Sequence, residues 1–89
     1  SIKYQQTLFD LAEIYARKFR KEIKENRKLI AKGVQFIEGI NSRGATEFSK
    51  RRLKYDEDTK YGTDLTKQQI WELQILKELN ELADFQFEK

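Results

Sequence analysis

Cationic side chains are the residues of this chain whose type and spacing favour a chemical task, the binding of phosphate or another polyanion. Four of them recur at intervals of four, three and four along a predicted helix: Arg17, Lys21, Lys24 and Lys28. This spacing places them on one helix face, where they could bind a nucleic-acid backbone or a nucleotide phosphate. Two other interpretations stay open. The face could be solvated, or it could pair with the acidic end of the chain, within one protomer or across an oligomer.

A second cationic group follows in the middle of the chain and consists of Arg43, Lys50, Arg51, Arg52 and Lys54. Guanidinium groups hold phosphate through two parallel hydrogen bonds, and Tyr55 and Tyr61 are candidates for stacking on a nucleobase. Three acids follow at once, at positions 56–58, and they would repel a phosphate backbone. The sequence therefore supports two hypotheses: nucleic-acid binding, and capture of a small phosphorylated ligand or nucleotide at an oligomer interface.

Catalytic residue types are scarce. The chain has no histidine and no cysteine, so it lacks the commonest general base, the thiolate nucleophile and the usual transition-metal ligands. The acidic segment 56–64 departs from a calcium-binding loop, because Lys60, Tyr61 and Lys67 occupy positions that need oxygen ligands or glycine. We expect no enzyme, no metal site and no cofactor.

Composition and length restrict the class of protein. The 89 residues are enough for one domain, which we assign to positions 1–89, and no apolar run approaches the 18 residues of a membrane span. The first residues do not resemble a signal peptide, so we expect a cytoplasmic protein without a membrane partner. The abundance of lysine, isoleucine, glutamate and asparagine is typical of an AT-rich genome, such as that of a phage or another mobile element.

Helical periodicity dominates the first half of the chain. There is no proline, and apolar residues from Tyr4 to Ile37 recur at spacings of three, four or seven, which predicts a helix over residues 3–40. One straight helix of this length would span about 57 Å, more than a domain of this size can cover. It must therefore break near Asn26 or Gly33, or pack on a partner chain.

Four further segments complete the prediction. Turn-forming residues at 41–44 should end the first helix, a short helix should cover residues 45–55, and a polar loop should span residues 56–64. A last helix should cover residues 66–85, with Thr66 and Gln69 as its capping box.

The last helix is apolar over more than half its circumference, whereas packing on one neighbour needs roughly 100°. One face carries Leu65, Leu73, Leu76, Leu79 and Ala83. The adjoining side carries Trp71, Ile75 and Leu82 and shares Leu79 at its edge. Either the helix lies between two others of the same chain, or one side contacts another molecule. We assign the contact with a partner or a second copy to Trp71, Ile75, Leu79, Leu82 and Phe85.

Charge is distributed unevenly along the chain. Residues 1–55 carry 14 basic and 6 acidic side chains, whereas residues 56–89 carry 4 basic and 9 acidic ones. Together these features predict an all-α helical hairpin or three-helix bundle with one long N-terminal helix, which forms a homo-oligomer. The function expected first is that of a non-catalytic regulator or inhibitor that binds a protein partner.

Overall fold

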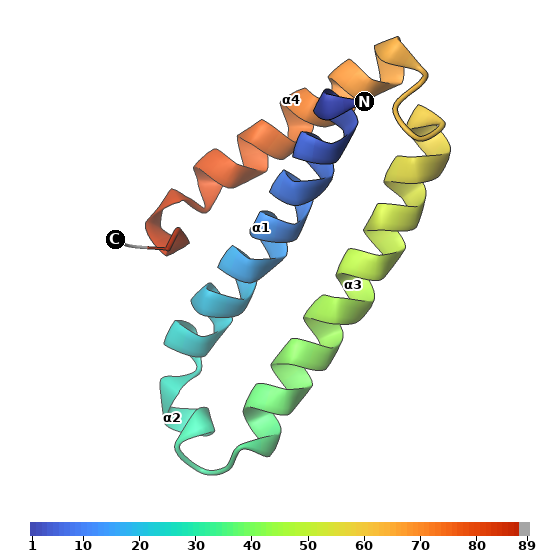
Figure 1. Cartoon of the computed structure of the whole chain (residues 1–89). Helices are drawn as coiled ribbons and strands as arrows, with labels where there is room; N and C mark the ends of the chain where they lie inside the picture. The colour runs from blue at the N-terminus through green and yellow to red at the C-terminus, as the bar shows by residue number, and fades with distance from the viewer. Residues whose placement is uncertain (88–89) are drawn as a thin grey trace.

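The chain folds into a helical bundle, seen in a computed structural model that describes residues 1–87. Its elements are α1 (Ile2–Glu25), α2 (Arg27–Ile30), α3 (Gln35–Thr59), α4 (Leu65–Glu81) and the short 3₁₀ helix η1 (Ala83–Phe85). Helices α1 and α3 form an antiparallel hairpin, with α2 at its end, and α4 returns alongside α1 (Figure 1). This confirms the predicted all-helical bundle and its long N-terminal helix.

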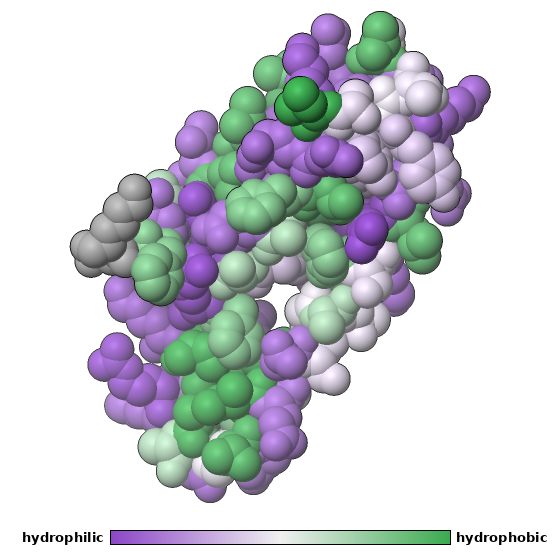
Figure 2. Space-filling model, in the orientation of Figure 1, coloured by the Kyte–Doolittle hydropathy of each residue, from purple (hydrophilic) through white to green (hydrophobic). Residues whose placement is uncertain are grey.

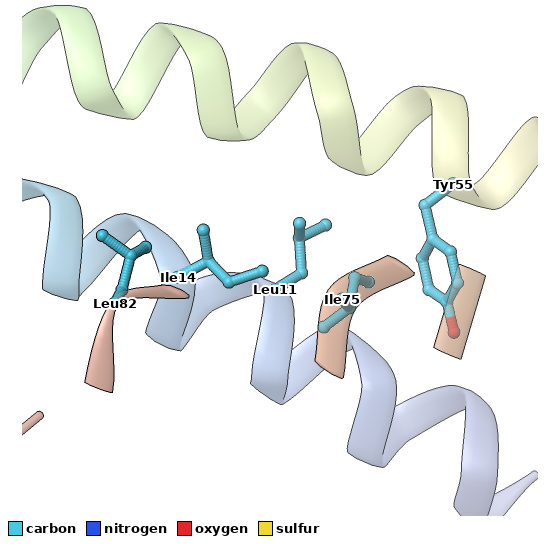
Figure 3. Packing of buried hydrophobic residues seen from close by; sticks show 5 residues of the cluster. All are labelled: Leu11, Ile14, Tyr55, Ile75 and Leu82. Carbon is cyan, nitrogen blue, oxygen red and sulfur yellow. The ribbon is translucent and has the colours of Figure 1, made fainter. Parts of the chain in front are cut away.

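The hydrophobic core lies where α1, α3 and α4 meet. The buried cluster consists of Leu11 and Ile14 of α1, Tyr55 of α3, Ile75 of α4, and Leu82 just after α4 (Figure 3). Each comes from the apolar stripe of its own segment, as expected for amphipathic elements that cover one another. The core therefore fixes which face of each helix remains open to solvent.

The segment predicted as helical over residues 3–40 is interrupted twice, so of the two alternatives that its length left open the chain adopts the break. Helix α1 ends at Glu25, and Asn26 caps it: its backbone N–H, at 2.9 Å, and its side-chain amide, at 2.8 Å, both donate to the carbonyl of Glu22. The chain then turns over residues 31–34 before α3 begins. Both breaks fall near Asn26 and Gly33, which the sequence had marked, and they let α3 fold back on α1.

The predicted turn at 41–44 and the short helix 45–55 are corrected to parts of one helix, α3. Residues with turn propensity remain helical here because Ile40 is buried and Phe48 packs against the core, contacting Tyr15 edge-on. Tertiary packing of this kind outweighs the roughly 1 kcal/mol that glycine costs in a helix interior.

The predicted loop 56–64 is shorter than expected, because α3 continues to Thr59. Two acids at the end of α3 have partners within the fold: Asp56 accepts a hydrogen bond from the hydroxyl of Tyr4, and Asp58 accepts one from Trp71 Nε1 at 3.1 Å. The last helix begins at Leu65, one residue early, and ends at Glu81 rather than 85. Its cap is Asp64, whose carboxylate accepts from the N–H of Lys67, so the Thr66 capping box was wrong.

The end of α3 adopts a left-handed backbone without glycine. Lys60 has φ 50° and ψ 52°, a conformation that costs an L residue free energy and that glycine adopts freely. We expect Lys60→Gly to raise the free energy of unfolding by about 0.5–1 kcal/mol in urea denaturation. Lys50→Gly, in the interior of the same helix, should lower it by about 1 kcal/mol. Equal effects of the two substitutions would contradict the assigned helix end.

Candidate functional site

The residues assigned to a partner interface lie inside the protomer. Ile75 and Leu82 are buried in the core, and Trp71, Leu79 and Phe85 pack against it. Trp71 is fixed further by its hydrogen bond to Asp58 and by a tilted contact with the Tyr55 ring at 5.2 Å. This side of α4 is therefore the side that builds the bundle, and a contact with another molecule has to use a different face.

The opposite side of α4 carries large aliphatic side chains in the open. They form a stripe that we call the α4 ridge: Leu65, Ile70, Leu73 and Leu76, each more than half exposed. Ile70, Leu73 and Leu76 recur at intervals of three, on the helix surface turned away from the buried residues Gln68 and Ile75. Helical spacing places Thr66, Gln69, Lys77 and Asn80 between them on the same face, so the ridge mixes large aliphatic side chains with polar ones and includes one charge. A mixed surface with few charged residues is typical of a protein contact surface.

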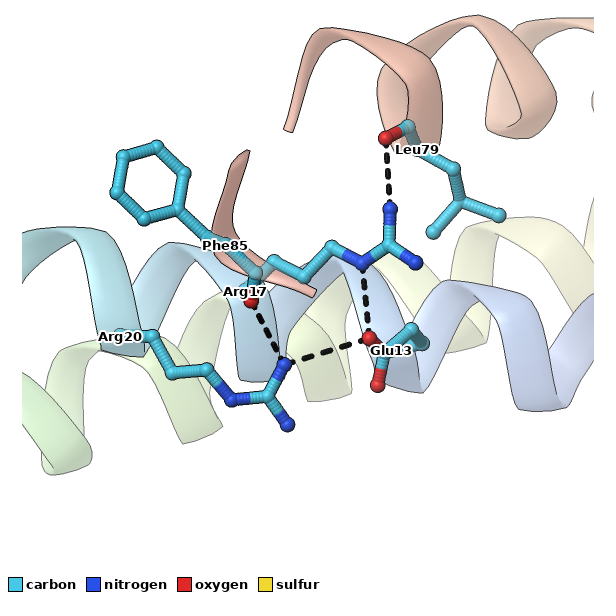
Figure 4. A network of polar contacts seen from close by, with 5 residues as sticks. All are labelled: Glu13, Arg17, Arg20, Leu79 and Phe85. Carbon is cyan, nitrogen blue, oxygen red and sulfur yellow. Dashed lines mark hydrogen bonds and ion pairs between the residues drawn. The ribbon is translucent and has the colours of Figure 1, made fainter. Parts of the chain in front are cut away.

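The predicted cationic face of α1 is partly neutralised within the fold. Arg17 donates from Nε to Glu13 at 2.8 Å and from Nη1 to the carbonyl of Leu79 at 2.7 Å (Figure 4). Arg20 reaches the carbonyl of Phe85 at 2.9 Å. The hydrogen bond from Arg17 lowers the pKa of Glu13. These arginines attach the end of α4 and η1 to α1, so Arg17 is not free for phosphate.

The other residues of that face differ in their surroundings. Lys21 is half-buried, Lys24 is exposed with its ammonium 5.9 Å from the centre of the Phe85 ring, and Lys28 is exposed. Because Lys28 follows the break at Asn26, it belongs to α2 and not to α1. The four residues do not form one continuous stripe.

The second cationic group is also divided. Arg51 forms a bidentate pair with Glu78 of α4, with both nitrogen–oxygen distances at 2.5 Å. Arg43 lies 3.6 Å from Glu22, and Lys54 lies 3.9 Å from Asp58. Lys50 and Arg52 are exposed. Three of the residues predicted to bind one phosphate together, Arg43, Arg51 and Lys54, therefore contact three different acids.

The two tyrosines predicted to stack on a base are not equivalent. Tyr55 is fully buried, stacks on Tyr4 at 5.3 Å and donates its hydroxyl to the Tyr4 carbonyl at 2.9 Å. Burial raises its pKa. Its assignment as a stacking residue for a ligand was wrong, because no surface of its ring is accessible, whereas Tyr61 is exposed.

A hydrogen-bonded cluster stabilises the end of the bundle that carries the N-terminus. Tyr4 donates to Asp56, and this bond together with burial raises the pKa of Tyr4 to about 12. Gln68, itself buried, donates to the Tyr55 hydroxyl at 3.0 Å and to Glu72 at 3.1 Å. All of these groups have partners, so the cluster accounts for fold stability and leaves no side chain aimed at a substrate.

A groove of about 270 Å³ lies between α1 and α3. It is lined by Ala12, Tyr15, Ala16, Phe19, Asn41, Gly44, Ala45 and Phe48, which are mostly small or aromatic. Within residues 1–87, no three acids are grouped so as to hold a metal ion. Of the helices in this part of the chain, none has both the length and the apolar character needed to cross a bilayer.

Comparison with known proteins does not assign the bundle to a family, since no protein-family model, curated protein or solved structure matches the chain. The surfaces described above are therefore the basis for a functional proposal. Sequence reasoning identified α4 as apolar on two sides, but the residues it assigned to an outside contact are those that pack inside the protomer.

Proposed function

We propose that this chain is a small, non-catalytic, cytoplasmic regulator or inhibitor that acts by binding a protein partner and by self-association. The observation that carries the proposal is the α4 ridge: four large aliphatic side chains in the open on a helix whose opposite side already forms the core. Scattered exposed leucines are ordinary, but several large aliphatic side chains that share one face of a helix are typical of an interaction surface.

The spacing of the ridge favours recognition of protein over other ligands. Ile70, Leu73 and Leu76 are suited to insertion into an apolar groove, the mode in which an amphipathic helix binds a partner. A nucleic acid or a nucleotide gains little from aliphatic side chains. The residues suggested for those ligands, such as Arg51 and Tyr55, are already occupied by contacts within the protomer.

Self-association gives the first test of the ridge. We expect the mass from light scattering to exceed the 10.7 kDa of the protomer and to rise with concentration. Leu73→Glu should return the mass to that of the protomer, because a carboxylate placed in an apolar contact loses its hydration without gaining a partner. Leu53→Glu is the matched control: Leu53 is a leucine of similar exposure, but on α3.

Partner binding is tested with the same three proteins as bait. A protein retained by the wild type and by Leu53→Glu, but lost with Leu73→Glu, would support the proposal. A wild type that stays at the protomer mass, together with capture that Leu73→Glu leaves unchanged, would rule it out. Circular dichroism of each variant establishes that the helices are intact.

A further inference from the structure

The end of the hairpin opposite the N-terminus, residues 24–36, combines two kinds of exposed side chain. Four are cationic: Lys24, Arg27, Lys28 and Lys32. Three are large and apolar: Leu29, Val34 and Phe36. Glu25 is the one acid in this segment. We call this region the hairpin end.

The positive charge of the hairpin end is not neutralised locally. Within residues 1–87, no salt bridge reaches Arg27, Lys28 or Lys32. The nearest acid on α1 before this segment, Glu22, lies 3.6 Å from Arg43 of α3. This contrasts with Arg17 and Arg51, which have carboxylate partners. The hairpin end is therefore a cationic surface that favours an anionic partner.

Its apolar side chains are open because α4 does not extend to them. The α4–η1 segment follows α1 as far as Lys24, whose ammonium lies near the Phe85 ring. Beyond that point Val34 is 69% exposed, and Leu29 and Phe36 are partly exposed, at 43% and 37%. Figure 2 shows apolar surface over this end of the molecule, where α1, α2 and α3 meet, with hydrophilic surface on either side.

We propose that the hairpin end docks on the surface of an anionic phospholipid membrane, with its cations at the headgroups and its apolar side chains at the acyl boundary. Each kind of side chain has a match there: basic residues are attracted to anionic lipids, and aliphatic residues enter the interface. In this arrangement the protein binds at the membrane surface and does not cross the bilayer. The lack of an apolar span, from which we expected no membrane partner, therefore does not argue against surface docking. The proposal is independent of the α4 ridge.

A nucleic acid matches only half of this surface. Phosphates would neutralise Lys28 and its neighbours, but Leu29 and Val34 would gain nothing from a phosphate backbone. Base stacking needs aromatic platforms, and Phe36 is the single aromatic residue of the hairpin end. The mixture of aliphatic and cationic side chains therefore favours lipid.

Vesicle co-sedimentation tests the docking directly. The full chain is mixed at low salt with vesicles of phosphatidylcholine alone, or of phosphatidylcholine with phosphatidylserine. We expect binding to the second kind only, and weaker binding as salt is added. Lys28→Gln should reduce partitioning about fivefold, and Val34→Asp about tenfold.

Matched controls come from α3. Lys50→Gln and Leu53→Asp alter exposed residues of the same types away from the hairpin end, and both should leave partitioning unchanged. The proposal is overturned by any of three results: equal binding to the two kinds of vesicle, no binding to the anionic vesicles, or anionic binding that Lys28→Gln and Val34→Asp do not reduce. Retention on DNA or RNA without vesicle binding would overturn it in favour of a polyanion.

Discussion

Replacing Tyr55 with alanine should lower the free energy of unfolding by about 3–5 kcal/mol, the range for removing a large buried aromatic side chain. Tyr55 is fully buried and lies between the rings of Tyr4 and Trp71, one from α1 and one from α4. It therefore contacts every long helix of the bundle. A domain of this length has only roughly 4–13 kcal/mol of stability in total, so the substitution should remove a large fraction of it.

Urea denaturation followed by circular dichroism measures this effect, with Tyr61→Ala as control. Tyr61 is an exposed tyrosine six positions away, and its removal should change stability by less than about 0.5 kcal/mol. Tyr55→Phe isolates the hydroxyl, which donates to the Tyr4 carbonyl and accepts from Gln68. Its loss should cost about 1–3 kcal/mol, because the two buried partners lose a hydrogen bond. A similar loss in the free energy of unfolding for Tyr55→Ala and Tyr61→Ala would show that Tyr55 does not join the three helices.

The helices themselves could be predicted from local pattern. A period near 3.6 and the absence of proline are properties of short windows, so the segment containing Leu11 and Ile14 was correctly predicted as helical. The break at Asn26 was also visible, since asparagine competes with the helix through its own side chain.

The helix over residues 41–44 could not be predicted in the same way. Its stability comes from the contact of neighbouring residues such as Phe48 with Tyr15, which is 33 positions earlier in the chain. Local propensity at Asn41 and Gly44 therefore gave a turn. Contacts of this kind decide helix boundaries wherever propensity is weak.

Local sequence pattern was also not enough to predict which side of α4 is exposed. A helical wheel shows that α4 is apolar on two adjoining sides, but it does not say which side packs inward. That choice is made by groups distant in sequence: Asp58 bonds to Trp71, and Arg51 bonds to Glu78. Once those two contacts orient the helix, Leu73 and Leu76 must face outward.

The pair between Arg51 and Glu78 is the second contact whose loss should be severe. It joins α3 to α4 through two hydrogen bonds, and both side chains are mostly buried, at 22% and 14% exposure. Arg51→Met removes the guanidinium group and leaves the mostly buried Glu78 carboxylate without the cation that pairs with it. We expect a loss of about 3 kcal/mol, since an uncompensated charge of this kind is strongly destabilising.

The double variant Arg51→Met/Glu78→Leu is the matched control. Replacing both partners by apolar side chains removes the stranded charge, so most of the lost stability should return. Urea denaturation of the wild type, the single variant and the double variant gives the comparison. If the double variant is no more stable than Arg51→Met, the contact would owe its importance to packing of the arginine stem and not to its charge.

The pH dependence of stability separates the charged contact from packing. The hydrogen bonds from Arg51 hold the pKa of Glu78 below its ordinary value of 4.5 in the folded protein. A carboxyl with a lowered folded pKa contributes stability above its unfolded pKa, and that stability is lost as the pH falls through the folded value. The wild type should therefore weaken below about pH 4.5. Arg51→Met should weaken less over the same range, because protonation of Glu78 then relieves an unpaired buried charge. A parallel acid-induced loss in both proteins would contradict this account. Among residues 1–87, Glu13, paired with Arg17, is the other carboxyl with a lowered pKa, and a parallel loss would assign the whole effect to it.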